Sequence, residues 1–416
     1  MADPLNLFII AGEPSGDRLG GALMQGLAAE TGGAVRFQGI GGRDMAQAGL
    51  ASLFDMGELS IMGLSEVLPR LPSLIRRIRQ TADAVIAARP GALITIDSPD
   101  FTLRVAKKAR KALPDLRVIH YVAPSVWAWR PGRAAKMARH VDHVLTLLPF
   151  EPPYMEAAGM SAEFVGHPIV GQSVPGEAEV SAWRASAAVQ PDQKLLLVAP
   201  GSRQGELRRL GPVFLETARR LLVDDPGLAV VLPAAETVAT EVVSLFSPLG
   251  EALRVLPPTV TAAEKRSAFA AADAALCASG TVTLELAAAG TPMVAAYRTT
   301  WLTAQIVRRV IRVNTANLIN LISGKSVVPE FLQEFCTPEA LTDALTPLLR
   351  DAAAAAVQRT AFDDVMVQLG RGGIDPGIRA ARSVLACLRG EVRPTGIAPA
   401  DALPPGPDAR HEGRIG

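Results

Sequence analysis

The chain has 416 residues, 49% of them apolar, and this length predicts two domains with separate cores. Lysine and arginine (42) balance aspartate and glutamate (41), which argues against a general nucleic-acid binder. The three cysteines are scattered, so they indicate no disulfide framework and no zinc site, and a reducing cytoplasm is expected. We see no signal peptide and no apolar run of membrane-spanning length, and we expect a soluble or peripheral protein.

Short apolar segments alternate with helical patterns along the chain, which predicts two doubly wound parallel sheets. The predicted strands are residues 5–11, 35–40, 92–96, 116–122 and 144–148, and then 195–199, 229–232, 253–256, 274–277 and 292–296. We therefore expect one α/β domain over residues 1–170, a linker over 171–180, and a second domain with the final helices over 181–390. A disordered tail is expected over 391–416. Ligands of such sheets bind at the carboxyl ends of the strands, so both domains should face a central cleft.

The stretch from Ala278 to Glu285 joins a predicted strand to a predicted helix. Ser279, Gly280 and Thr281 form the turn, where backbone N–H groups at a helix start would bind a phosphate. Glu285 lies about one helical turn further and could accept hydrogen bonds from sugar hydroxyls. A phosphate at the helix start and a sugar at Glu285 together predict a nucleotide-binding site. The alternative is an ordinary capped turn with a surface glutamate.

A second turn of this kind runs from Pro200 to Glu206. Gly201 and Ser202 permit a tight bend, and Arg203 could hold a phosphate with two parallel hydrogen bonds. The alternative for Arg203 is a surface salt bridge.

In the first domain, Asp97 follows the predicted strand 92–96 and could serve as a general base towards an acceptor hydroxyl. The alternatives are a helix cap, for which Asp100 is better placed, and a metal site that lacks a third ligand. His120 and His167 are further candidates for the base. A glycine-bearing turn with Ser15, Gly16 and Asp17 follows the first strand.

The segment from His120 to Arg130 concentrates aromatic residues beside arginines. Trp127 and Arg130 would suit a sugar-phosphate or acyl acceptor. The alternative is a packed loop between sheet and helix.

Residues 64–80 combine apolar positions at spacings of three and four with several arginines, and Pro72 favours a helix start near that point. Such a segment can lie on an anionic membrane surface or pack on the sheet. The residues that would contact a membrane are Leu71, Leu74, Ile75, Ile78, Arg76 and Arg77.

Several blocks, in order, resemble the bacterial lipid-A-disaccharide synthase family. They are residues 11–17, 97–101, 120–130, 148–151, 164–167, 200–203 and 278–285, together with Asn320 and 328–333. The block Tyr-Val-Ala-Pro-Ser-Val-Trp-Ala-Trp-Arg is long and specific, whereas the glycine turns alone would not be.

The resemblance implies a GT-B fold, with two Rossmann-like domains, the donor nucleotide in the second one, and no metal or other cofactor. It implies an inverting transfer of 2,3-diacylglucosamine from its UDP donor to 2,3-diacylglucosamine 1-phosphate, in lipid A biosynthesis. Because both substrates carry acyl chains, it also implies a peripheral enzyme on the cytoplasmic face of the inner membrane. That favours the membrane interpretation of residues 64–80.

The resemblance assigns roles to individual positions. Asp97 matches the candidate base, and the UDP-binding positions are Gly201, Ser202, Arg203, Ser279, Gly280, Thr281, Glu285, Asn320 and Gln333. Ile319 departs from the family, which more often has proline before that asparagine. The acceptor or cleft positions are Ser15, Gly16, Asp17, His120, Trp127 and Arg130.

Two rival functions fit parts of the sequence. One is another GT-B enzyme on a UDP-amino sugar, either an epimerase or a transferase with a different acceptor. The other is a nucleotide-sugar-binding protein without turnover. Acyl chain length, the identity of the base among Asp97, His120 and His167, and the oligomeric state, including a homodimer, stay open.

Overall fold

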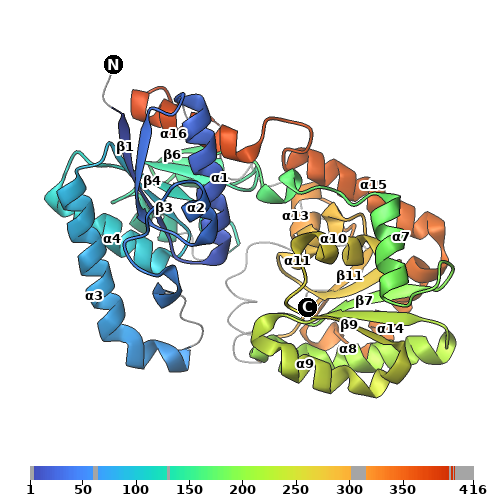
Figure 1. Cartoon of the computed structure of the whole chain (residues 1–416). Helices are drawn as coiled ribbons and strands as arrows, with labels where there is room; N and C mark the ends of the chain where they lie inside the picture. Colours follow the sequence, from blue (N-terminus) through green and yellow to red (C-terminus); the bar gives the residue numbers. More distant parts are fainter. Residues whose placement is uncertain are drawn as a thin grey trace. The chain divides into compact units, whose positions relative to one another are not determined.

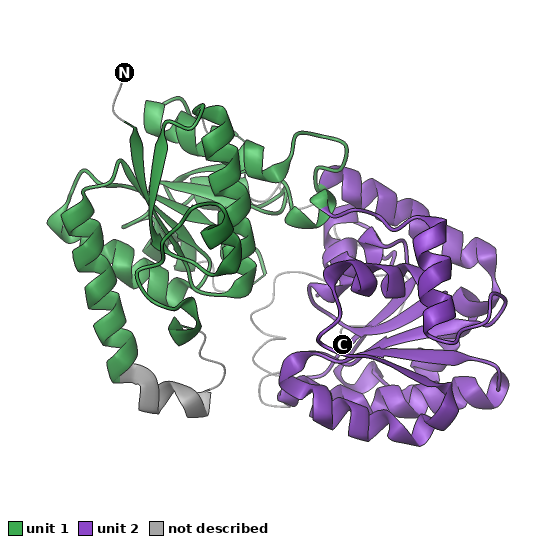
Figure 2. Ribbon diagram, viewed as in Figure 1, with its two compact units in different colours: residues 1–171, 369–402 green, residues 172–368, 403–416 purple. Residues whose placement is uncertain are grey.

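The computed structural model describes residues 4–59, 64–128, 132–300, 315–392, 395–396 and 398, with the side chains of 64–71 left out. The described chain forms two compact units (Figure 2). Unit 1 comprises residues 1–171 and 369–402, and unit 2 includes residues 172–368.

Unit 1 is built on a parallel six-stranded sheet in the order β2-β1-β3-β4-β5-β6. The strands are β1 (Leu5–Ala11), β2 (Val35–Ile40), β3 (Ala92–Ile96), β4 (Arg117–Tyr121), β5 (His143–Thr146) and β6 (Ser161–Phe164). The five strands predicted for this domain are confirmed, and β6 is an addition. The strand order reverses between β1 and β3, and ligands bind at such a reversal in doubly wound sheets.

Helices cover the sheet of unit 1 because each crossover between parallel strands carries one (Figure 1). They are α1 (Pro14–Glu30), α2 (Arg43–Gln47), α3 (Leu64–Ala88), α4 (Pro99–Ala112), α5 (Gly132–Met137) and α6 (Pro152–Glu156), with short 3-10 turns at Met56–Leu59 and Pro168–Gly171.

The last described helix, α16 (Pro376–Arg389), belongs to unit 1, so the prediction that the second domain extends to residue 390 is wrong. Helix α16 packs on α1, where a Cβ on Gly26 would lie 2.5 Å from the carbonyl oxygen of Gly377. Its Ser383 Oγ also lies 2.8 Å from His143 Nε2 on β5. These contacts join residues far apart in the chain, which the local pattern used for the prediction does not record.

Unit 2 has a second parallel six-stranded sheet, in the order β12-β11-β10-β7-β8-β9. Its strands are β7 (Leu195–Ala199), β8 (Ala229–Pro233), β9 (Leu253–Leu256), β10 (Ala274–Ala278), β11 (Met293–Tyr297) and β12 (Glu330–Leu332). The two-domain α/β fold is therefore confirmed. The five strands predicted for this domain are present, and β12 is an addition.

The first helix of unit 2 begins at Glu177, inside the stretch 171–180 that was predicted as a linker. The helices of unit 2 are α7 (Glu177–Ser186), α8 (Gln204–Asp224), α9 (Ala239–Phe246), α10 (Ala262–Ala271), α11 (Val282–Ala288), α13 (Leu318–Ser323), α14 (Pro338–Arg350) and α15 (Ala352–Gln368), with 3-10 turns at Glu236–Val238, Ser247–Ala252 and Gln333–Phe335. Nearly all of the predicted tail, 391–416, lies outside the described residues. No helix in the described ranges is long and apolar enough to cross a bilayer.

Candidate active site

The turn after β3 holds the candidate base in an unusual backbone conformation. Asp97 and Ser98 have φ angles of 47° and 44°, in the left-handed region. Each such residue costs on the order of 1–3 kcal/mol and persists only where surrounding contacts hold it. Here the Asp97 amide donates to the Tyr121 carbonyl (3.0 Å), and Thr102 Oγ1 donates to the Asp97 carbonyl (2.7 Å).

The carboxylate of Asp97 is half-buried, and no described residue donates a hydrogen bond to it. The alternative role as a helix cap is not what the structure shows, because Ser98 occupies the cap position of α4 and no side chain makes a cap hydrogen bond there. A strained turn at the strand-order reversal therefore presents a carboxylate that accepts no hydrogen bond from the described residues, so it is available to accept a proton.

The turn between β1 and α1 lies against this carboxylate turn. A Cβ on Gly12 would lie 2.6 Å from Ser98 Oγ, so only glycine fits there. One on Gly16 would lie 3.4 Å from Ile96 Cγ2 at the end of β3. Ser15 is exposed at the same turn. The structure thus brings Ser15 and Gly16 to the same edge of the sheet as Asp97.

Asp17 is buried and held by backbone groups, and its predicted acceptor role stays a prediction. Its side chain is 4% exposed and accepts hydrogen bonds from the amides of Gly42 (2.7 Å), Asp44 (2.8 Å) and Met45 (3.1 Å). These amides belong to the first turn of α2, which lacks other partners for them. Asp17 therefore anchors α2 to α1.

Trp127 is buried rather than open to an acceptor. Its Nε1 donates to Glu151 Oε1 (3.2 Å), and its ring meets the edge of Phe150 at a centroid distance of 5.3 Å. Glu151 also accepts from the amides of Leu147 (3.2 Å) and Leu148 (3.0 Å), and its burial raises its pKa to about 7. Trp127 therefore agrees with the alternative of a packed loop between sheet and helix. Arg130 lies outside the described residues.

Neither histidine suits the role of base. His120 is buried in β4, where its Nδ1 lies 2.8 Å from Thr95 Oγ1, and burial lowers its pKa to about 4. His167 Nδ1 accepts from the Ile169 amide (3.2 Å), and burial lowers the pKa of His167 to about 4 as well. Both rings are neutral at pH 7 and are weak proton acceptors.

In unit 2, the turn after β10 presents backbone donors. A Cβ on Gly280 would meet nothing within 4 Å, and Thr281 is exposed. No described residue accepts a hydrogen bond from the amides of Gly280 and Thr281. Ser279 differs, because its hydroxyl donates to Glu330 Oε1 (2.7 Å). The amides, rather than the serine hydroxyl, are free to meet an anion.

Glu330 on β12 is a residue that the sequence interpretation missed, although the motif around it is part of the resemblance. Besides Ser279 it accepts from Thr315 Oγ1 (2.8 Å) and from the Ala316 amide (3.0 Å). One carboxylate thus ties the β10 turn to the segment that precedes α13. Only the pairing of β12 with β11 brings these residues together.

Glu285 on α11 is paired in this structure. Its Oε2 lies 2.7 Å from Lys265 Nζ, and both side chains are partly exposed. The lysine ammonium also lies 5.1 Å from the centre of the Phe269 ring. A sugar diol at Glu285 would therefore meet a carboxylate that Lys265 already holds in place.

In the turn from Pro200 to Glu206, the carboxylate of Glu206 occupies the backbone N–H groups. Glu206 Oε2 accepts from the amides of Ser202 (3.2 Å) and Arg203 (3.4 Å), and Gly201 (φ 109°) leaves room for that carboxylate. The Arg203 side chain is 79% exposed and lies 3.4 Å from Glu206 Oε1. The guanidinium is accessible to a ligand, whereas the amides of this turn are occupied.

Asn320 was predicted to bind UDP, but the structure gives its side chain another task. It is 2% exposed, its Nδ2 donates to the Val328 carbonyl (2.8 Å), and its Oδ1 accepts from the amides of Val327 (2.9 Å) and Val328 (2.8 Å). All of its amide group fixes the loop before β12, and the UDP-binding role of this side chain stays a prediction. Ile319, beside it, is fully buried.

Gln333 has a left-handed backbone (φ 52°) directly after β12. Its Oε1 accepts from the Thr299 amide (3.2 Å), and its carbonyl accepts from Arg298 Nε (3.1 Å). Gln333 therefore joins the ends of β11 and β12.

The predicted membrane residues on α3 divide into two groups. Ile78 is 3% exposed and lies in the core of unit 1, so the prediction that it contacts a membrane is wrong, and Leu74 packs partly against the same core. Arg77 is paired with Glu58 and lies over Phe54. Ile75 and Arg76 are exposed. The side chain of Leu71 is outside the description.

Within the described parts of the chain, no three His, Cys, Asp or Glu side chains are grouped so as to hold a metal ion.

Solved structures that match this chain define its fold class. A UDP-GlcNAc 2-epimerase from Neisseria meningitidis, solved with UDP-GlcNAc, matches with a TM-score of 0.59 at 11% identity, over 92% of this chain and 99% of its own. A glycosyltransferase from Rickettsia africae matches with a TM-score of 0.57 at 9% identity, over 93% and 99%. The fold is the two-domain α/β fold of GT-B glycosyltransferases and epimerases.

The sequence comparisons define the family. A family model described as lipid-A-disaccharide synthetase matches residues 7–373. Lipid-A-disaccharide synthase from Ruegeria pomeroyi is 53% identical over 391 residues, 93% of this chain and 96% of the relative. The enzyme of that name from Rhodospirillum centenum is 46% identical over 386 residues, 92% and 94%. This chain belongs to the lipid-A-disaccharide synthase family, as the resemblance predicted.

Proposed function

We propose that this protein is a hexosyltransferase that moves 2,3-diacylglucosamine from its UDP donor to 2,3-diacylglucosamine 1-phosphate. The products are the β-1,6-linked lipid A disaccharide 1-phosphate and UDP. Relatives at up to 53% identity, matched over nearly their whole length, carry the name lipid-A-disaccharide synthase. The structural observation that carries the catalytic part is the carboxylate of Asp97, which lies on a strained turn and has no hydrogen-bond donor among the described residues.

The reaction is one in-line displacement with inversion at the anomeric carbon. Asp97 accepts the proton of the acceptor 6′-hydroxyl as its oxygen attacks the donor, and the bond from the anomeric carbon to the diphosphate breaks. Holding the hydroxyl at Asp97 also supplies the orientation that a displacement needs.

The leaving diphosphate gains negative charge, and unit 2 offers donors for it. The free amides of Gly280 and Thr281 and the exposed guanidinium of Arg203 would stabilise that charge. Glu285 would hold the ribose. On this account the protein's own donors take the part that metal ions play in other transferases, so the transfer proceeds without added metal.

Epimerase activity on a UDP-amino sugar is the second candidate, and the sequence relatives do not favour it. The epimerase match at 11% identity reflects the fold alone. The two candidates also differ in substrates, because an epimerase needs no acylated acceptor.

We further propose that the protein is peripheral on the cytoplasmic face of the inner membrane, since both substrates carry acyl chains. The exposed Ile75 and Arg76 on α3 support this placement, as an apolar and a basic residue on one exposed helix segment suit an anionic interface.

The test is UDP release from UDP-2,3-diacylglucosamine in EDTA, with and without the acylated monosaccharide phosphate. Acceptor-dependent release, with the disaccharide found by mass spectrometry, is the expected result. Release that ignores the acceptor, or a requirement for added metal, would contradict the proposal. If the protein binds UDP but does not release it from the donor, the nucleotide site is supported and a different acceptor must be tested.

A further inference from the structure

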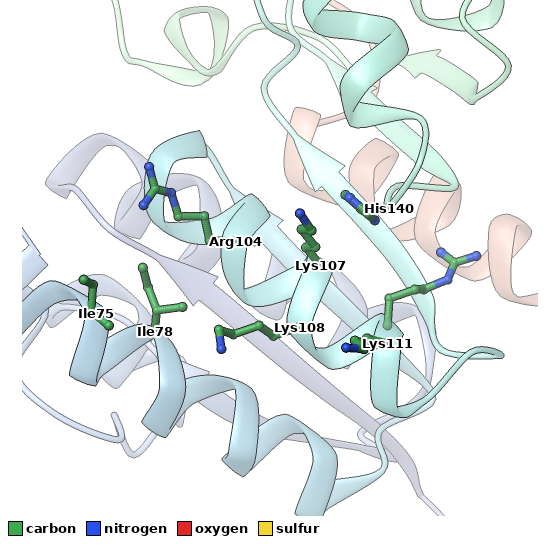
Figure 3. A pocket seen from close by; sticks show the side chains of 8 residues that line it. Ile75, Ile78, Arg104, Lys107, Lys108, Lys111 and His140 are labelled. Carbon is green, nitrogen blue, oxygen red and sulfur yellow. The ribbon is translucent and has the colours of Figure 1, made fainter.

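A groove of about 610 Å³ lies between α3 and α4 on unit 1, outside the site described above (Figure 3). The two helices lie side by side (Figure 1). Ile75 and Ile78 of α3 form its apolar wall. The rest of its lining is basic, and it consists of Arg104, Lys107, Lys108, Arg110 and Lys111 of α4 together with His140.

Four of these cations form one stripe on α4. Arg104, Lys107, Lys108 and Lys111 stand at positions i, i+3, i+4 and i+7, and all four are exposed. Arg110 is separate, because it is paired with Asp142 at 2.7 Å and 2.9 Å. No described carboxylate lies within salt-bridge distance of any residue of the stripe.

The stripe repels itself, because like charges three and four residues apart on a helix destabilise it. An ordinary solvated helix face mixes both signs at these spacings, whereas no acidic side chain among the described residues lines this groove. The surroundings of His140 agree with this excess of positive charge. Its pKa is lowered by partial burial and by the nearby cations Lys107, Arg110 and Arg139.

We infer that this groove binds the headgroup of an anionic phospholipid of the bilayer, with the phosphate on the α4 stripe and the upper part of an acyl chain against the exposed Ile75, beside the nearly buried Ile78. An apolar wall beside clustered lysines suits an amphiphile with an anionic head, whereas a nucleic acid has no apolar chain to cover that wall. The inference rests on the peripheral membrane placement proposed above and gives it a defined site.

The test uses the full chain and co-sedimentation with vesicles of phosphatidylcholine, with or without phosphatidylglycerol. The protein is expected to bind the anionic vesicles and not the neutral ones. Each cation near such a surface contributes about a fivefold factor, so K107Q/K108Q should weaken binding roughly 25-fold. The matched control is R36Q/R219Q, which removes two exposed cations that have no ion-pair partner among the described residues, and it should bind like the wild type.

A second variant tests the apolar wall. Ile75 is 39% exposed, so I75S should leave the fold intact and still weaken binding to anionic vesicles, by about fivefold on the area it exposes. Thermal unfolding provides the folding control. K107Q/K108Q relieves repulsion within α4, so it is expected to unfold at the same temperature as the wild type or slightly above it.

Unchanged vesicle binding in K107Q/K108Q would overturn the inference. Equal losses in K107Q/K108Q and R36Q/R219Q would also overturn it, because they would mean a diffuse charge effect without a groove. Tighter binding to a single-stranded RNA oligonucleotide than to anionic vesicles would replace the lipid as occupant. Turnover on substrates dispersed in nonionic detergent separates the transferase proposal from the lipid-groove inference. An inactive wild-type protein in that assay would contradict the transferase proposal, whereas the vesicle binding would still support the groove.

Discussion

Asp17 offers the sharpest distinction between a structural and a substrate-binding residue, because the sequence placed it in the acceptor site and the structure makes it an anchor for α2. Its carboxylate accepts three backbone N–H bonds while almost fully buried. In D17N, the new Nδ2 donor would face the Asp44 or the Gly42 amide. One buried N–H would then lose its acceptor, at a cost of about 1–3 kcal/mol.

The variant also loses a negative charge at the first turn of α2, which contributes about 0.3–1 kcal/mol. The sum is about 1–4 kcal/mol, which corresponds to a fall of about 3–16 °C in the Tm of unit 1, at roughly 2–4 °C per kcal/mol. The assay is calorimetry together with kcat at a temperature where the variant is folded. The matched control is D44N, which removes a carboxylate from the same helix turn whose side chain accepts no hydrogen bond from the described residues. It should lose at most about 1 kcal/mol.

A D17N protein with wild-type stability and kcat reduced a hundredfold would refute this reasoning, because it would mean that the carboxylate meets substrate. Wild-type kcat with the predicted loss of stability would place Asp17 outside the chemistry.

Two further predictions concern buried polar groups. N320A removes the acceptor for the amides of Val327 and Val328, so it should cost about 3 kcal/mol of stability. UDP affinity, measured by calorimetry at low temperature, should change less than about threefold. A large loss of UDP affinity in a fully stable protein would instead show that Asn320 binds the ligand. His143 is buried between Ser161 and Ser383, and burial lowers its pKa to about 4, so the unfolded chain binds this proton more tightly. The stability that neutral His143 contributes to the fold, roughly 3 kcal/mol, should therefore be lost as pH falls from about 6.5 to 4. H143Q should show a flatter pH dependence of Tm over that range. Equal slopes in the variant and the wild type would contradict this prediction.

The sequence predicted the architecture well because hydrophobic alternation is a local signal. Ten of the twelve strands are visible as short apolar runs between helical patterns. The two additions, β6 and β12, carry partly exposed residues and lack such a run, as Ser161–Phe164 and Glu330–Leu332 show. The placement of α16 in unit 1 depends on contacts with α1 and β5, which no local pattern records.

The candidate site was predicted less completely, because residue type does not reveal which partner a polar group has. In the sequence, Asp17 and Asn320 resemble ligand-binding residues. In the structure, their polar atoms form hydrogen bonds with backbone groups that the fold brings close. Glu206 likewise fills a turn predicted to hold phosphate. By contrast, Asp97 and Gly280 were located correctly at strand ends, since the end of a parallel strand is readable from the sequence.

The central claim is that Asp97 is the base of an acceptor-dependent transfer, and the most direct measurement is the rate of UDP release by D97N at saturating acceptor. Asparagine tolerates the left-handed backbone of this turn, so the fold should persist. In D97N turnover should fall by about 10² or more with UDP affinity unchanged, while D100N, three residues further in the first turn of α4, should stay near wild type. Near-normal turnover in D97N would contradict the account.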